Sequence, residues 1–291
     1  MTKTMRVKDE YLRRVLAGEA KLLFDGAMGT MLQHQGLQGG ELPELLCLTN
    51  PDEVTAIHRA YVEAGSQVVT TNTFGANRLR LGGEASVDDV FAAAVKCARD
   101  AGATYVAADL GPTGELLDPL GDLEFEEAYE LYAEQVRAAM SAGADLFIVE
   151  TMADPQEAQA AVTAAKDHGD VPVFATMTFG EVGRTLFGTT PEDAAKLLAE
   201  WGADAVGINC SVGPKALVPL IAQMRGACDL PLIAQPNAGL PQVVDGQTVY
   251  TITPADYAAS VGKIMAEGAT IVGGCCGTDP DFIRELAKVV R

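Results

Sequence analysis

The feature that most constrains this chain is a pattern that recurs along it: a helical segment ends in glycine, and a run rich in β-branched residues follows. The pattern occurs as EAGSQVVTTNTF, DAGATYVAADLGP, SAGADLFIVET, EWGADAVGINCS and AEGATIVGGCC. Glycine just past the last helical residue is a common helix end, and a β-branched run is typical of a buried strand. KLLFDG, VPVFATMTF and PLIAQPNAG supply three more strand candidates. The chain therefore carries eight βα units.

Helix starts are equally regular. Asn50, Thr190 and Thr253 each precede a proline, with an acidic residue in the first turn, and we expect their side chains to cap the helices. No Pro/Gly/Ser-rich linker divides the chain. Eight such units predict an α/β fold, a single (β/α)8 TIM barrel spanning residues 1–291. A doubly wound sheet in two halves is the alternative.

Composition excludes several classes of partner. The chain of 291 residues is 48% hydrophobic, and 21 Lys and Arg against 40 Asp and Glu give a formal net charge of −19. Such a charge repels nucleic acids and anionic membrane surfaces. No window reaches the roughly 18 apolar residues of a membrane helix, and no secretory signal is evident. We therefore expect no nucleic acid or membrane partner and a cytoplasmic location. Six cysteines are too few for a disulfide scaffold.

Polar side chains and thiols follow nearly every predicted strand. Barrel active sites form where the strands end, so these residues predict a functional rim. They are Asp25-Gly26, Thr71-Asn72-Thr73, Asp109 with Gly111-Pro112, Glu150-Thr151, Thr176 to Thr178, Asn209-Cys210, Gln235 with Asn237, and Cys275-Cys276.

Three of the cysteines are expected on that rim. Cys210 follows the sixth strand, and Cys275 and Cys276 follow the eighth. Three thiolates suit zinc and leave its fourth position open, as in a catalytic site. We therefore predict a zinc site at the ends of strands 6 and 8, with these cysteines as metal ligands and catalytic residues. Of the other cysteines, Cys97 and Cys228 are expected to pack without a chemical role. Cys47 is the one other credible candidate for a metal ligand. The three histidines, His34, His58 and His168, are expected to be exposed or hydrogen-bonded.

A zinc ion with three thiolates carries a net charge of −1, so it favours binding another thiol over making hydroxide. Coordination would deprotonate a substrate thiol and give a nucleophile at neutral pH. Asp25 and Glu150 on the same rim would bind a substrate ammonium, and backbone N–H groups from Gly26 to Gly29 a carboxylate. The structural alternatives are a turn-forming Asp25 and a helix-capping Glu150.

Seven motifs together resemble the homocysteine S-methyltransferase family, most closely the N-terminal homocysteine-binding module of cobalamin-dependent methionine synthase. They are DGAMGTMLQ, TNTF, LGPTG, GRTLFGTT, NCSVGP, PNAGLP and GGCCGT, and the likeness covers about residues 10–291. It implies a zinc-bearing barrel that binds homocysteine. Cys210, Cys275 and Cys276 match the metal ligands, and Asp25 and Glu150 match the acids that contact homocysteine. Neighbouring residues in the matching motifs, Gly26, Ala27, Thr73, Asn209 and Asn237, are the further substrate-binding candidates.

The motifs do not identify the methyl donor. The folate, cobalamin and activation modules of methionine synthase would not fit within 291 residues, so we expect the donor to come from elsewhere. A methyl-corrinoid such as methylcobalamin on a separate partner protein is the first hypothesis, and S-methylmethionine or another small methyl-sulfonium is the second. Betaine is disfavoured, because Thr151 stands where the betaine-using branch has tyrosine.

Two hypotheses of another class stay open from the sequence. The glycines before Cys275 lie where many barrels bind phosphate, which favours a phosphate-ligand enzyme with incidental cysteines. A non-catalytic zinc-binding protein is the other alternative. Zinc content and its dependence on Cys276 distinguish these hypotheses from a methyltransferase.

Overall fold

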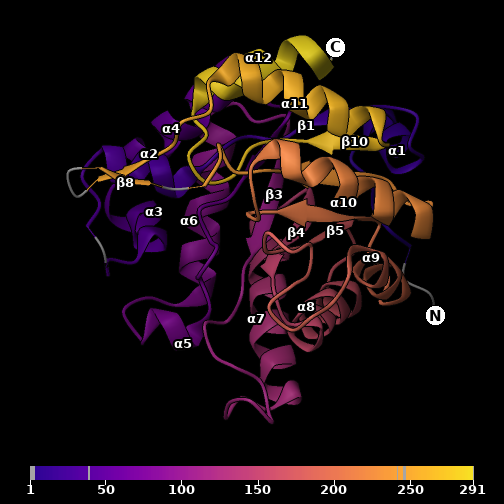
Figure 1. The fold of residues 1–291 in the computed structure, drawn as a ribbon. Helices are drawn as coiled ribbons and strands as arrows, with labels where there is room; N and C mark the ends of the chain where they lie inside the picture. Colours follow the sequence, from indigo (N-terminus) through magenta and orange to yellow (C-terminus); the bar gives the residue numbers. More distant parts are fainter. Residues whose placement is uncertain (1–3, 39, 241, 245–246, 291) are drawn as a thin grey trace.

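The computed structural model describes residues 4–38, 40–240, 242–244 and 247–290; the ends of the expected domain, residues 1–3 and 291, lie outside them. Eight parallel strands form one sheet in the order β1-β10-β7-β6-β5-β4-β3-β2, and Figure 1 shows helices lying around these strands. The strands are β1 Leu22–Leu23, β2 Val68–Thr70, β3 Tyr105–Leu110, β4 Leu146–Met152, β5 Val173–Met177, β6 Ala205–Asn209, β7 Leu232–Gln235 and β10 Ala269–Val272.

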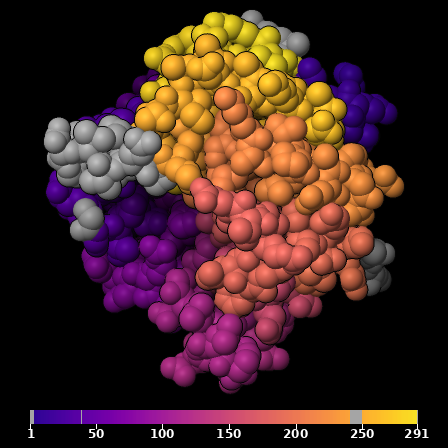
Figure 2. Space-filling view, in the orientation of Figure 1, coloured from indigo at the N-terminus to yellow at the C-terminus, as the bar shows by residue number. Residues whose placement is uncertain are grey.

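The two edge strands of this sheet meet and nearly close it. Gln67, just before β2, donates its backbone N–H to Leu23 O at 2.8 Å, and its side-chain oxygen accepts the N–H of Leu23 at 3.1 Å. Figure 2 shows the yellow C-terminal segments packed near indigo N-terminal ones, and α12 (Pro280–Val290) contacts both β1 and α4 (Pro51–Ala64). The predicted (β/α)8 barrel is therefore confirmed, and the doubly wound alternative is wrong.

One helix, α1 Glu10–Leu16, precedes β1, and the longer helices after it follow strands and cover the outside of the barrel. The helices after α1 are α2 Met28–His34, α3 Leu46–Thr49, α4 Pro51–Ala64, α5 Arg78–Leu81, α6 Val87–Asp100, α7 Phe125–Ala142, α8 Pro155–His168, α9 Pro191–Glu200, α10 Pro214–Ala227, α11 Pro254–Ala266 and α12 Pro280–Val290, with a 3-10 turn η1 at Pro43–Leu45. A small antiparallel hairpin, β8 Gln242–Val244 and β9 Gln247–Val249, follows β7. None of the described helices combines the length and apolar character needed to cross a membrane.

The helix boundaries follow the expected signals with one exception. The glycines of the recurring pattern have left-handed backbones, as Gly65 (φ 116°) and Gly143 (φ 87°) illustrate. Thr190 and Thr253 cap α9 and α11 by accepting the N–H of the third residue on. Asn50 does not cap α4, because its side-chain amide donates to Glu53 instead.

The barrel interior is filled below the level of the site. Phe24, Ile148 and Phe174 are fully buried there, and α1 closes the opposite end with Leu12 and Val15. A larger apolar layer lies between the sheet and the outer helices. Because the described residues fill the lower barrel, a ligand inside the barrel finds room at the carboxyl ends of the strands.

Candidate active site

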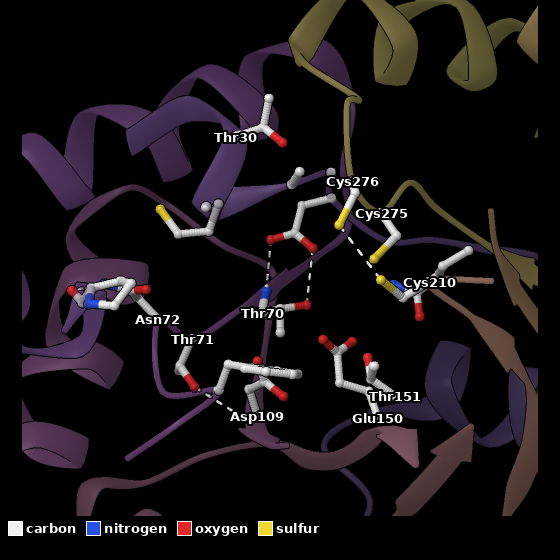
Figure 3. Close-up of a pocket in the computed structure, with 18 of the residues that line it drawn as sticks. Thr30, Thr70, Thr71, Asn72, Asp109, Glu150, Thr151, Cys210, Cys275 and Cys276 are labelled. Carbon is white, nitrogen blue, oxygen red and sulfur yellow. Dashed lines mark hydrogen bonds between the residues drawn. The ribbon is translucent and has the colours of Figure 1, made fainter. Parts of the chain in front are cut away.

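A cavity of about 260 Å³ opens at the carboxyl ends of the strands. Figure 3 shows Cys210, Cys275 and Cys276 on one side of it and Asn72 on the opposite side, with Asp109 and Glu150 between them along one edge. The lining residues come from strand ends β1, β2, β3, β4, β6, β7 and β10, from the start of α2, from η1, and from the segment between β2 and the end of α5. The cavity is therefore placed where barrel enzymes hold their reacting groups.

The three rim cysteines converge in space. Their sulfur atoms lie within 4.8 Å of one another, and the Sγ atoms of Cys210 and Cys276 are 3.5 Å apart. Backbone hydrogen bonds fix the loops that carry them: Cys275 N–H donates to Pro236 O, and Ala238 N–H donates to Cys276 O. The group does not include Cys47, the other candidate ligand, or Cys97 and Cys228.

The sulfur cluster fits a tetrahedral metal ion. Zinc–sulfur bonds of about 2.3 Å at tetrahedral angles put sulfur atoms about 3.8 Å apart, close to the observed spacing. Among the described residues, no other Cys, His, Asp or Glu completes the group, so a metal there would keep an open position. Hydrogen bonds from Cys210 and Cys275 lower the pKa of Cys276, whereas that of Cys275 is raised. Without a cation the cluster therefore favours a single negative charge.

Asp25 and Glu150 face the same cavity from β1 and β4. Both oxygens of Asp25 accept hydrogen bonds from Thr70, one from its N–H at 2.8 Å and one from its hydroxyl at 2.9 Å. Burial nevertheless raises the pKa of Asp25 to about 7. Burial also raises the pKa of Glu150 to about 8, aided by the charges of Asp25 and Cys276. Both carboxyl groups would lose their protons more readily beside a bound cation.

The remaining predicted residues divide into two sets. Gly26 and Ala27 line the cavity, and Ala27 N–H donates to Thr278 Oγ1 at 3.3 Å. Thr73, Asn209 and Asn237 do not line it.

Asn209 instead joins three strands. Its Oδ1 accepts from the N–H of Thr151 and the hydroxyl of Thr176, and its amide donates to Thr151 Oγ1, all at 2.8 Å. Thr151 follows Glu150 and has a left-handed backbone (φ 62°), which a non-glycine residue adopts at a cost. Asn209 therefore holds the segment that presents Glu150.

One expectation about histidine is wrong. His58 in α4 is fully buried, and neither ring nitrogen has a hydrogen-bond partner among the described residues. Burial lowers its pKa to about 3, so the ring is neutral. His34 is exposed, and His168 bonds to Tyr129 as expected.

Sequence reasoning missed two carboxylates of the cavity as site residues. The sequence places Asp109 among the polar residues at the predicted strand ends, but no pattern distinguishes it from the other residues there. Glu44 lies in η1, inside the long connection after β1, and reaches the cavity through tertiary packing. A sequence pattern does not specify where such a connection folds back.

Comparison with known proteins agrees with this geometry. Residues 22–290 match the family profile described as homocysteine S-methyltransferase. The chain belongs to the homocysteine S-methyltransferase family. It is 35% identical to methionine synthase of Mycobacterium tuberculosis over 97% of this chain and 25% of that protein, and 34% identical to that of Mycobacterium leprae over 96% and 24%. The chain thus spans about a quarter of the length of these relatives.

Solved structures of a homocysteine methyltransferase share the fold. The metallated form of MmuM from Escherichia coli superimposes with a TM-score of 0.80 at 24% identity, covering 96% of this chain and 99% of that one. Its apo form gives a TM-score of 0.75 at 26% identity, covering 96% and 100%. The family member described here therefore has the same barrel over nearly its whole length.

Proposed function

We propose that this chain is a zinc-dependent methyltransferase that moves a methyl group to homocysteine and so forms methionine. The observation that carries the proposal is one cavity with three converging thiols on one side and buried carboxylates beside them. The family and the similarity to methionine synthases support homocysteine as the acceptor.

Cys210, Cys275 and Cys276 would hold the zinc ion. When bound, it would keep the sulfur of homocysteine as a thiolate at neutral pH. The metallated form of the Escherichia coli relative accords with this assignment. Four carboxylates in the cavity lining, Asp25, Glu44, Asp109 and Glu150, would repel a phosphate, which disfavours the phosphate-ligand alternative.

The chain's own residues would orient the amino-acid end of homocysteine. Glu150 and Asp25 would bind its ammonium group, and the hydrogen bonds from Thr70 fix the carboxylate of Asp25 in one orientation. The backbone from Gly26 to Gly29 lines the cavity beside them, and its N–H groups other than that of Ala27, which donates to Thr278, would receive the carboxylate. Fixing both charged groups limits the positions that the sulfur can take, which is the main contribution of a binding site to a displacement reaction.

The donor in this proposal is a methyl-corrinoid carried by a separate protein. Similarity to methionine synthases supports methyl transfer to homocysteine, and the motif resemblance to the homocysteine-binding module of cobalamin-dependent methionine synthase supports a corrinoid as the donor. The partner would dock over the strand ends and contact residues 33–49, 111–124 and 178–190; residue 39 lies outside the described chain. Such a contact forms and breaks at each turnover, so we expect it to bury about 1,200 Å² or less.

A small methyl-sulfonium such as S-methylmethionine is the second candidate donor. It is favoured by one observation: the cavity lining holds more buried carboxylates than the single ammonium of homocysteine needs.

The test is a methyl-transfer assay with homocysteine and three donors: a methylated corrinoid protein, free methylcobalamin and S-methylmethionine. Methionine formation that requires stoichiometric zinc supports the proposed activity. Turnover with S-methylmethionine alone would reject the corrinoid partner, and no methionine from any donor would reject the activity itself.

A further inference from the structure

The two adjacent cysteines of the cluster set a geometric requirement on the loop that carries them. Successive side chains of an extended chain point to opposite sides, yet the sulfur atoms of Cys275 and Cys276 both lie within 4.8 Å of that of Cys210. The chain turns here, because Thr278 N–H donates to Cys275 O at 3.1 Å and Gly277 has a left-handed backbone (φ 80°). This combination is typical of a type II turn. Both thiols therefore face one point only while residues 273–278, the metal loop, keep this shape.

Tyr257 of α11 holds the start of the metal loop. Its hydroxyl donates to Pro236 O at 2.8 Å and to Gly273 O at 3.0 Å. Pro236 O also accepts the N–H of Cys275 at 3.0 Å. Tyr257 is fully buried, and its ring packs edge-on against Phe282 of α12 with the ring centroids 5.3 Å apart. The hydroxyl therefore ties the end of β10 to the segment after β7 at the point where Cys275 is attached.

Tyr61 of α4 holds the other end of the metal loop. Its hydroxyl donates to Thr278 O at 3.2 Å and to Ala27 O at 3.0 Å. The side-chain hydroxyl of Thr278 strengthens this connection, because it accepts Ala27 N–H at 3.3 Å and donates to Cys275 O at 2.7 Å. A Cβ atom on Gly26 would lie 3.0 Å from the Tyr61 hydroxyl, so the close approach depends on glycine. Tyr61 therefore joins the metal loop to the segment after β1.

The arrangement of these two hydroxyls goes beyond what the burial of a tyrosine requires. A buried tyrosine hydroxyl needs one acceptor for its single proton. Tyr61 and Tyr257 each reach two carbonyl groups, one in the metal loop and one after a strand that flanks β10 in the sheet. The buried hydroxyl of Tyr132, by contrast, bonds to Gly111 and Glu157, which are outside the metal loop. Groups that orient metal ligands from behind commonly set the affinity of a metal site.

We propose that Tyr61 and Tyr257 are positioning residues that hold the two ends of the metal loop and so keep the thiols of Cys275 and Cys276 directed at one metal ion. The inference rests on the proposed zinc site and deepens it. The two tyrosines differ in one respect. Tyr61 also holds Ala27, in the backbone segment proposed to receive the carboxylate of homocysteine. Tyr61 should therefore affect both metal and substrate binding, and Tyr257 metal binding alone.

The experiment compares Tyr61→Phe and Tyr257→Phe with the matched control Tyr132→Phe. All three residues are fully buried, and each variant keeps the ring and removes one hydroxyl. Thermal unfolding measures the stability that each variant loses. Zinc affinity is measured by competition with a chromophoric chelator. Cobalt(II) in place of zinc gives absorption bands that report the number and geometry of the thiolate ligands.

We expect Tyr61→Phe and Tyr257→Phe each to weaken zinc binding by about tenfold or more and to change the cobalt spectrum. Tyr132→Phe should match the parent in both measurements even where its thermal stability falls as far, because a loss of stability alone does not rearrange the ligands. The inference is overturned if the two site variants match Tyr132→Phe in zinc affinity and in the cobalt spectrum. Thr278→Val, which removes the hydroxyl between Ala27 and Cys275, tests the same end of the loop should Tyr61→Phe not fold.

Homocysteine binding to zinc-saturated protein separates the two tyrosines. Tyr61→Phe should weaken it by about fivefold, the effect of one neutral hydrogen bond, and Tyr257→Phe by less than twofold. Equal losses would refute the separate role of Tyr61. Zinc binding that depends on both hydroxyls in a protein forming no methionine would reject the proposed function and keep the positioning role. Methionine formation with parental zinc affinity in both variants would do the reverse.

Discussion

The sulfur atoms of Cys210 and Cys276 lie 3.5 Å apart although 66 residues separate them in the chain. β6 and β10 are not neighbours in the sheet, because β7 lies between them. The contact forms because the loops that follow these two strands begin on the same rim of one barrel. Since two thiolates at this distance repel each other, the pair is stable only with shared protons or a bound cation.

Zinc binding should depend on each of the three clustered thiols. Cys210→Ala, Cys275→Ala and Cys276→Ala are each expected to reduce bound zinc from about one equivalent to well below it, because two thiolates do not fill a zinc site. Metal analysis after dialysis measures this. Cys228→Ala, at the end of α10 and outside the cluster, serves as the control. Full zinc retention by any one of the three variants would remove that residue from the site.

Glu150→Gln should discriminate between thiols with and without an amine. A charged hydrogen bond contributes about 1.5–3 kcal/mol, so the variant should bind homocysteine roughly 10–100-fold more weakly. Binding of 4-mercaptobutyrate, which lacks the amine, should change little. Titration of both thiols into zinc-loaded protein measures the difference. Equal losses for both would mean that Glu150 has a structural role only.

The metal-free, ligand-free protein should lose stability as pH rises through neutrality. The pKa of Asp25 is about 7 and that of Glu150 about 8 in the fold, both above their ordinary values. The folded state therefore binds more protons than the unfolded state between about pH 4 and 8, and the free energy of unfolding falls over that range.

Glu150→Gln removes one of these titrating groups and tests the effect. Between pH 5 and 8, urea unfolding of the parent should show a loss larger than that of the variant by roughly 3–4 kcal/mol. The difference between the two proteins reports the titration of Glu150 together with its effect on Asp109, whose pKa the charge of Glu150 helps to raise. Parallel pH profiles would contradict the prediction.

The rim loops should affect a docked donor more than a free one. Val182 and Leu186, between β5 and α9, are 86% and 84% exposed, and Leu116 and Leu120 after β3 are also exposed. Apolar side chains gathered on active-site loops are typical of a contact surface. Val182→Glu with Leu186→Glu should slow methyl transfer from a methylated corrinoid protein and leave free methylcobalamin unaffected. Tyr11→Glu at the opposite end of the barrel is the control; equal rates in all three proteins would exclude this surface.

The sequence by itself determined the architecture and the metal candidates. Glycines such as Gly65 and Gly143 require a left-handed backbone at helix ends, and β-branched runs require burial, so local chemistry alone sets eight alternating units. Once those units form a barrel, strand ends share one rim, which places Cys210, Cys275 and Cys276 together. The recurrence of a local pattern was therefore sufficient for eight βα units, and the contact of Gln67 with Leu23 that closes the sheet separated the barrel from the doubly wound alternative.

Only the tertiary structure decided which polar groups face the cavity and which are left without partners. Asn209 and Asp109 are both polar residues at strand ends, yet the atoms of Asn209 are bonded to Thr151 and Thr176, and the carboxylate of Asp109 is not bonded by any described residue. Glu44 reaches the site from a connection without strand or helix periodicity. Hydrogen-bond partners across a barrel depend on strand register and loop path. Those are set by packing between segments far apart in the chain, and no local pattern encodes them.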